Sequence, residues 1–164
     1  MEASQSVPDL VAVAQASAKT HYDAIEQIRA AADDAAPSGA QLADMHTQAA
    51  ALAALAVDIF AVFEARMQHH FKRGPFSRKL HALLTGAGQP QLAYRIYQFY
   101  LAVNVLKHGT GASYRELSKS ETHLFAVKLD SETDDAGILI DVTTPDFFDG
   151  LTAAILESYH FLER

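Results

Sequence analysis

The sequence predicts a mainly α protein: an antiparallel four-helix bundle with a β-hairpin inserted before the last helix. Apolar residues recur at steps of three and four through most of the chain, which is the spacing of helices with one buried face. Proline, glycine and capping residues divide this pattern into segments with mostly short connections, as in antiparallel bundles. One stretch, about residues 123–142, is instead rich in β-forming residues and predicts the hairpin. At 164 residues the chain suits one domain, and we expect 1–164 to form it.

Two long helices are predicted in the first half of the chain. Residues 8–35 keep a helical apolar spacing until a Pro-Ser-Gly sequence interrupts it. Ser38 and Gln41 then match a capping box, in which each side chain bonds to the backbone N–H of the other residue. We therefore expect the second long helix to begin there and to stop at Gly74 and Pro75.

Two polar residues interrupt the apolar stripe of this second helix. Steps of three and four lead to Arg66 and His70, where apolar residues are due. Burying such groups costs several kcal/mol unless they are paired or hydrated, so they indicate a candidate site. In the alternative interpretation, the stripe shifts by one residue to Met67 and Phe71 and leaves both polar side chains at its edge.

The second half of the sequence predicts four more helices and the hairpin. Residues 77–85 suit a short helix, and Pro90 opens a third core helix. Ser113 and Glu116 match a second capping box, which predicts a short helix ending near Ser118. The last core helix is expected to follow the hairpin, with an N-cap threonine and a proline at its first position.

The predicted hairpin covers HLFAVKL and GILIDV, which flank an acidic turn. Asp130, Glu132 and Asp134 in this turn alternate like the first ligands of an EF-hand loop. The glycine that such a loop needs is replaced by Asp135, and strands rather than helices are expected on either side. A solvated turn is therefore the favoured interpretation.

Composition restricts the partners. The net charge of −7 disfavours a broad nucleic-acid-binding surface, because affinity for phosphates comes from clustered Lys and Arg. Residues 66–81 form a local basic cluster, so RNA is a disfavoured partner rather than an excluded one. The chain has no cysteine, which excludes disulfides and fits a cytoplasmic location. We expect no membrane span, because no apolar run approaches about 18 residues.

The clearest candidate site lies at the end of the third core helix. Asn104 and His108 are four residues apart and therefore share a helix face, which we expect to border a cleft. Gly109 suits the turn that ends the helix. His108 has two interpretations, a general acid or base, or a cation that complements the helix dipole.

The region Leu92–Leu117, with LAVNVLKHG at the helix end, resembles the HEPN-like superfamily of four-helix bundles, found in bacterial toxin, abortive-infection and nucleotide-handling proteins. The usual mark of that superfamily is an Arg separated from a His by four to six residues, often with a polar residue directly after the Arg. Asn104 and His108 match the polar residue and the His, whereas Val103 stands in place of the Arg. The resemblance implies metal-independent RNA cleavage, usually across a homodimer interface.

Three functions follow from these observations. The first is a non-catalytic HEPN-like module that acts through homodimerisation or a protein partner, in a bacterial toxin–antitoxin or phage-defence setting. Valine cannot stabilise charge on a phosphate, which favours this function. Tyr94, Tyr97 and Tyr100 cluster on the third core helix and suit a dimer interface.

The second function is a metal-independent endoribonuclease in which Arg66, brought from the second helix, replaces the missing cation. Its catalytic candidates are His108, Asn104, Arg66, Lys107 and His70. The third is a small-ligand or metal-binding bundle that uses His69, His70 and His108, although no H-x-x-x-H pair places two histidines on one helix face. The favoured function needs no cofactor and no metal.

Overall fold

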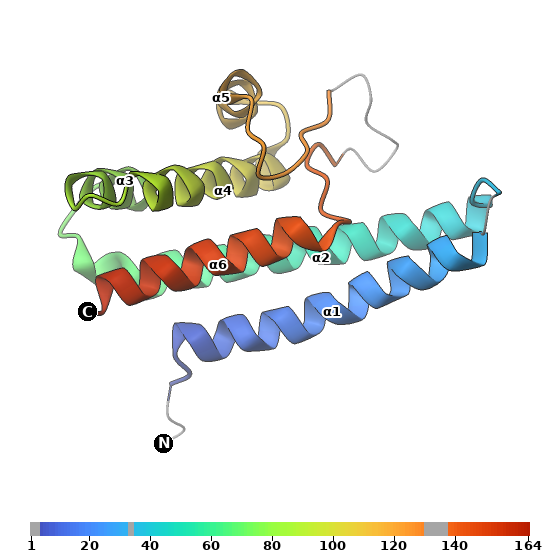
Figure 1. The fold of residues 1–164 in the computed structure, drawn as a ribbon, viewed down its shortest axis with the longest axis horizontal. Helices are drawn as coiled ribbons and strands as arrows, with labels where there is room; N and C mark the ends of the chain where they lie inside the picture. The colour runs from blue at the N-terminus through green and yellow to red at the C-terminus, as the bar shows by residue number, and fades with distance from the viewer. Residues whose placement is uncertain (1–3, 33–34, 130–137) are drawn as a thin grey trace.

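The computed structural model describes residues 4–32, 35–129 and 138–164 (Figure 1). Within these residues the chain forms six α-helices and one 3₁₀ turn, and no strand. The elements are α1 (Val7–Ala32), α2 (Gly39–Met67), η1 (Gln68–His70), α3 (Phe76–Gly86), α4 (Pro90–His108), α5 (Ala112–Ser120) and α6 (Pro145–Leu162). The mainly α class is confirmed, and each helix corresponds to a helix that the sequence predicts.

The long helices α1, α2, α4 and α6 alternate in direction along the chain (Figure 1). Helices α2 and α6 lie between the other two, because α1 packs on α2 and α6 from one side and α4 packs on them from the other. The short helices α3 and α5 pack on α4. Gly150 permits the close approach of α6 to α4, since a Cβ atom at this position would lie 2.8 Å from the Phe99 ring.

The capping box predicted at the start of α2 is present. The Ser38 hydroxyl accepts from the Gln41 N–H at 3.1 Å, and the Gln41 side chain accepts from the Ser38 N–H at 2.8 Å. These bonds satisfy two backbone donors that helix geometry leaves free, so local sequence fixes this helix end.

Arg66 and His70 do not enter the core. Met67 is 4% exposed and completes the buried stripe of α2, and Phe71 packs against the core. Arg66 and His70 lie on the surface, so the structure supports the shifted stripe. The segment Gly39–His70 is long and apolar enough to cross a membrane, a test that the core helices of soluble proteins also pass.

The prediction of a β-hairpin over residues 123–142 is wrong. Within the described part of this stretch, a single antiparallel bridge joins Val127 and Ile140. The Lys128 N–H donates to the Leu139 carbonyl at 2.6 Å, and the Asp141 N–H donates to the Ala126 carbonyl at 3.0 Å. Among the described residues, the two segments therefore meet at this bridge but form no longer ladder.

Side chains from the helices take the place of the missing ladder. The Tyr114 hydroxyl donates to the Lys128 carbonyl at 3.0 Å, and the Tyr22 hydroxyl donates to the Val142 carbonyl, also at 3.0 Å. Leu139 and Ile140 are both buried, although successive residues of a strand point to opposite faces. The alternating acids Asp130, Glu132 and Asp134 lie outside the described residues.

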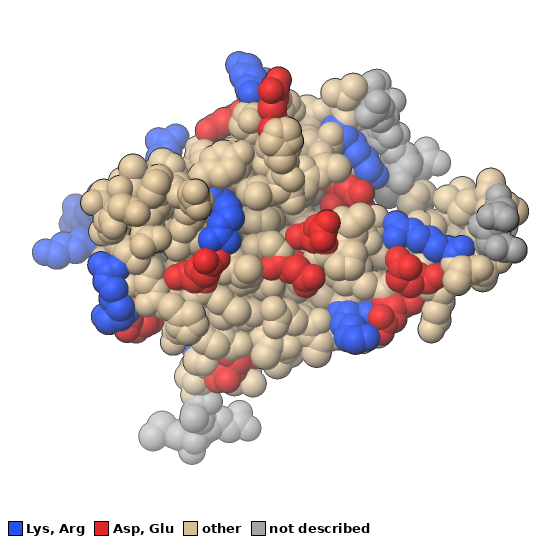
Figure 2. Space-filling model, in the orientation of Figure 1, with Lys and Arg blue, Asp and Glu red and all other residues tan. Residues whose placement is uncertain are grey.

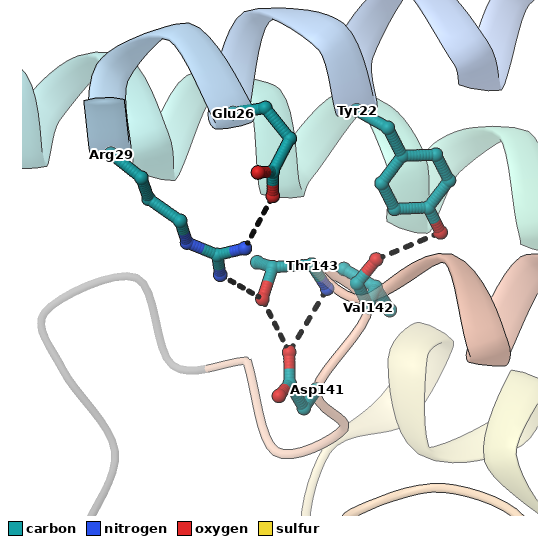
Figure 3. Close-up of polar contacts among 6 residues, drawn as sticks. All are labelled: Tyr22, Glu26, Arg29, Asp141, Val142 and Thr143. Carbon is teal, nitrogen blue, oxygen red and sulfur yellow. Dashed lines mark hydrogen bonds and ion pairs between the residues drawn. The ribbon is translucent and has the colours of Figure 1, made fainter. Parts of the chain in front are cut away.

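A polar network ties the segment before α6 to α1 (Figure 3). Arg29 donates to Glu26 at 3.1 Å and to the Thr143 hydroxyl at 3.3 Å. Asp141 accepts from the Thr143 N–H at 2.9 Å and from its hydroxyl at 2.6 Å. This turn sets the entry of α6, whose N-cap is Thr144 as predicted, although that side chain makes no capping bond.

Candidate functional site

The predicted site at the end of α4 borders a real hollow, which we call the α4–α5 pocket. It has a volume of about 220 Å³ and is lined by Asn104, His108, Gly109, Gly111, Ala112 and Ser113. Gly109 ends α4 with φ at 71°, a conformation that favours glycine. The backbone then turns at once into α5, so the end of one helix faces the start of the next.

The second predicted capping box is wrong. Helix α5 begins at Ala112, its N-cap is Gly111, and no side chain caps it. Ser113 instead accepts from the Asn104 amide at 3.3 Å, and Glu116 accepts from the Tyr97 hydroxyl at 2.7 Å. Both residues of the expected box thus bond to α4 rather than to each other.

The chemistry of the α4–α5 pocket is polar and weak in positive charge. Asn104 is half-buried, and His108 is exposed at the rim. Val103 is 1% exposed and belongs to the core, so the motif position occupied by Arg in HEPN-like proteins faces away from the solvent here. The pocket offers an amide, an imidazole and a hydroxyl, which suit hydrogen bonding to water or to a small polar group.

Arg66 is not brought to this pocket. Its guanidinium donates to the Ser4 hydroxyl at 2.8 Å and to the Gln5 carbonyl at 2.9 Å, just before α1. His108 ends α4, which lies on the other side of α2 and α6 from α1 (Figure 1). The Arg66 guanidinium therefore contacts the residues before α1, and the His108 imidazole lies at the α4–α5 pocket.

Lys107 approaches a half-buried carboxyl that the sequence did not single out. Burial raises the pKa of Glu64 on α2, and the positive charge of Lys107 on α4 opposes that rise. A lone glutamate on a long helix has no spacing signal, which is why Glu64 escaped notice. Of the five predicted catalytic residues, only Asn104 and His108 line one hollow.

The three tyrosines of α4 have different environments. The Tyr97 ring lies 5.4 Å from the His81 ring and 5.7 Å from the Tyr100 ring. Burial and the hydrogen bond to Glu116 raise the pKa of Tyr97 to about 12. Tyr97 and Tyr100 pack against the core, whereas Tyr94 is 43% exposed.

A second side-chain cluster lies where α2 and α6 end. We call His69, His70 and Glu163 the His–Glu cluster, because one ligand atom from each lies within 4.8 Å of the others. His70 Nε2 is 3.1 Å and His69 Nε2 is 3.9 Å from Glu163 Oε1. The sequence drew attention to the two histidines but not to Glu163, which is 93 residues from His70.

A third feature is an uncharged surface, residues 80–94, formed by most of α3, the connection to α4 and the first turn of α4. These residues include no Lys, Arg, Asp or Glu, and Figure 2 shows a broad uncharged area over α3. Leu83 and Tyr94 are 42% and 43% exposed within it. Most of the other exposed residues here are small or amides.

Comparisons with known proteins add no assignment: no protein-family model, no curated protein and no solved structure matches the chain.

Proposed function

We propose that the chain is a non-catalytic, HEPN-like helical module that acts by pairing with a second copy of itself through the uncharged surface. The exposure of Leu83 and Tyr94 in this charge-free stretch carries the proposal. Large apolar side chains at the centre of an interface supply most of its binding energy, and charged residues are depleted there.

Self-association suits this surface for a reason of symmetry. In a twofold dimer the same patch contacts itself, so every charge near the axis faces an identical charge. Residues 80–94 avoid that repulsion, although the chain as a whole carries a net charge of −7. The same acidic charge disfavours RNA as the partner.

The absence of a positioned guanidinium supports a non-catalytic module. RNA cleavage needs donors placed where negative charge develops, and losing one such donor typically costs about 10²–10³ in rate. Val103 is buried in the core, and Arg66 bonds to residues that precede α1. His108 and Asn104 therefore lack the partner that the endoribonuclease alternative requires.

The first test measures the mass of the full chain by analytical ultracentrifugation over a range of concentrations. We expect a dimer for the wild type and a monomer for Leu83→Glu and Tyr94→Glu, because each change places two like charges across the twofold axis. Val13→Glu is the matched control: Val13 is an exposed apolar residue of α1, 56% exposed, and its replacement should leave the dimer intact. A wild type that stays monomeric, or equal effects of all three changes, would refute pairing through this surface.

The second test separates the module from the endoribonuclease. The wild type and His108→Ala are incubated with single-stranded RNA in the presence of a chelator. We expect both proteins to leave the RNA intact. If the wild type cleaves RNA and His108→Ala does not, the protein is an endoribonuclease that uses the α4–α5 pocket. This outcome does not depend on the oligomeric state.

A further inference from the structure

We propose that the His–Glu cluster is a binding site for a divalent late first-row transition metal ion, represented by Zn²⁺, held by His69, His70 and Glu163. Two imidazoles and one carboxylate form a known zinc ligand set, which leaves a fourth position for water or an added ligand. This inference is independent of the proposed pairing, because the cluster lies outside residues 80–94.

The spacing of the ligand atoms fits a single ion. Zinc bonds to His nitrogen and carboxylate oxygen are about 2.0–2.2 Å long, so two ligand atoms at tetrahedral positions lie roughly 3.4 Å apart. The Nε2–Oε1 distances of 3.1 Å for His70 and 3.9 Å for His69 lie on either side of this value. The centres of the two imidazole rings are 4.2 Å apart, and one ligand atom from each of the three residues lies within 4.8 Å of the others. Small side-chain rotations bring the three atoms onto one ion.

A hydrogen bond outside the cluster prepares His69 for coordination. Its Nδ1 lies 2.8 Å from the Arg66 carbonyl oxygen, which can only accept, so Nδ1 carries the proton. In the neutral ring Nε2 then has a free lone pair, and this is the nitrogen that faces Glu163. A backbone carbonyl bonded to the second nitrogen is the usual support of a metal-ligating histidine.

The surrounding fold presents the ligands without a local motif. His69 and His70 lie in η1, directly after α2, and Glu163 directly follows α6. Because α2 and α6 pack on each other, their ends bring the three side chains together. Arg66 and Arg164, which are close to the cluster in sequence, are engaged elsewhere: Arg66 bonds to Ser4 and Gln5, and Arg164 lies 3.8 Å over the Phe161 ring. An ion here would join the end of α6 to the connection between α2 and α3.

The test uses the full chain without a polyhistidine tag, after dialysis against a chelator. Zn²⁺ is titrated in competition with a chromophoric chelator, and binding of Co²⁺ is followed by its visible absorption. We expect one Zn²⁺ per chain and a tetrahedral Co²⁺ spectrum. His70→Ala and Glu163→Gln should each weaken Zn²⁺ binding at least about 10-fold, since even indirect supports of a metal site commonly contribute that much.

His160→Ala is the matched control, because His160 is an exposed histidine in the last turn of α6, three residues before Glu163. This change should leave Zn²⁺ affinity within about twofold of the wild type. Circular dichroism establishes that each variant is folded before the titration. The site is rejected if the wild type loses the competition at equimolar Zn²⁺, or if His160→Ala weakens binding as much as His70→Ala does.

Discussion

The α4–α5 pocket and the His–Glu cluster differ in how the chain assembles them. The pocket is local: Asn104 to Ser113 supply all its lining residues, and a helix end followed by a glycine turn creates it. The cluster is not local, since Glu163 reaches His70 across 93 positions of sequence. Sequence spacing therefore revealed the residues of the pocket, but in the cluster it pointed to the two histidines and not to Glu163. The pocket brings together an amide, an imidazole and a hydroxyl, whereas the cluster brings together two imidazoles and a carboxylate.

The largest expected effect tests whether the motif of the pocket can be restored. Val103→Arg would place a guanidinium at a position that is 1% exposed, among apolar neighbours. An unpaired buried charge is expensive, so we expect the free energy of unfolding to fall by at least about 3 kcal/mol. Urea denaturation measures this loss.

Asn104→Arg is the control for this change, because it introduces the same side chain at the next position, which is half-buried and borders the pocket. We expect it to change the unfolding free energy by less than about 1 kcal/mol. A Val103→Arg protein as stable as the wild type would show that position 103 can turn outward. The proposal that no guanidinium can be positioned at the pocket from residue 103 would then fail.

The next prediction tests whether Zn²⁺ stabilises the protein through the His–Glu cluster. Zinc at a concentration of 100 times its dissociation constant should raise the unfolding free energy of the wild type by about 2.7 kcal/mol, because the ion binds only the folded chain. His70→Ala should remove this increase, and His108→Ala should keep it. Thermal unfolding with and without Zn²⁺ measures both, and an increase that depends on His108 instead would place the metal at the pocket.

A smaller effect compares two helix starts with the same sequence pattern. Ser38→Ala should lower the unfolding free energy by about 1 kcal/mol, because it removes a formed capping box. Ser113→Ala should change it by less than about 0.5 kcal/mol, because Ser113 caps nothing and only accepts from Asn104. Equal losses from the two changes, measured by urea denaturation, would mean that α5 is capped by Ser113 after all.

The smallest effect appears at alkaline pH and concerns the hydrogen bond from Tyr97 on α4 to Glu116 on α5. Burial and Glu116 raise the pKa of Tyr97 to about 12 from the ordinary value of 10.0. Between these two pH values the unfolded chain ionises this tyrosine and the folded chain does not, so its contribution to stability is present below pH 10 and falls as the pH rises. Tyr97→Phe should therefore lose less stability between pH 9 and pH 11 than the wild type does. If stability falls equally steeply with pH in both proteins, the raised pKa of Tyr97 is contradicted. Burial also raises the pKa of Tyr22, so the loss of stability that comes from Tyr22 remains in both proteins.

Sequence reasoning succeeded for the elements whose ends are fixed locally. Ser38 with Gln41, Gly109 and Pro145 each define a helix end through their own backbone or side-chain preferences. It failed for the hairpin, where β-forming residues near 123–142 serve as packing for the helices. Phe125 illustrates this, since its ring lies 5.3 Å from Phe99 and 5.5 Å from Phe147.

The candidate site shows the same division. The pairing of Asn104 with His108 on one face follows from helix periodicity, and both do line the same pocket. Helix periodicity does not predict the absence of the second capping box. That box is absent because Ser113 accepts from Asn104, and Glu116 accepts from Tyr97, both of which lie on α4. The placement of Arg66 beside Ser4 and of Glu163 beside His70 likewise depends on which helix ends meet.

The sequence by itself determined the mainly α class and the succession of helices. Those features depend on interactions between residues that are close in sequence, and the spacing of apolar residues predicts them directly. Only the tertiary structure decided which polar side chains become neighbours. A hydrogen bond or a metal site depends on atoms within a few ångströms, and the packing of α2 against α6 and of α4 against α5 sets those distances without any trace in local spacing.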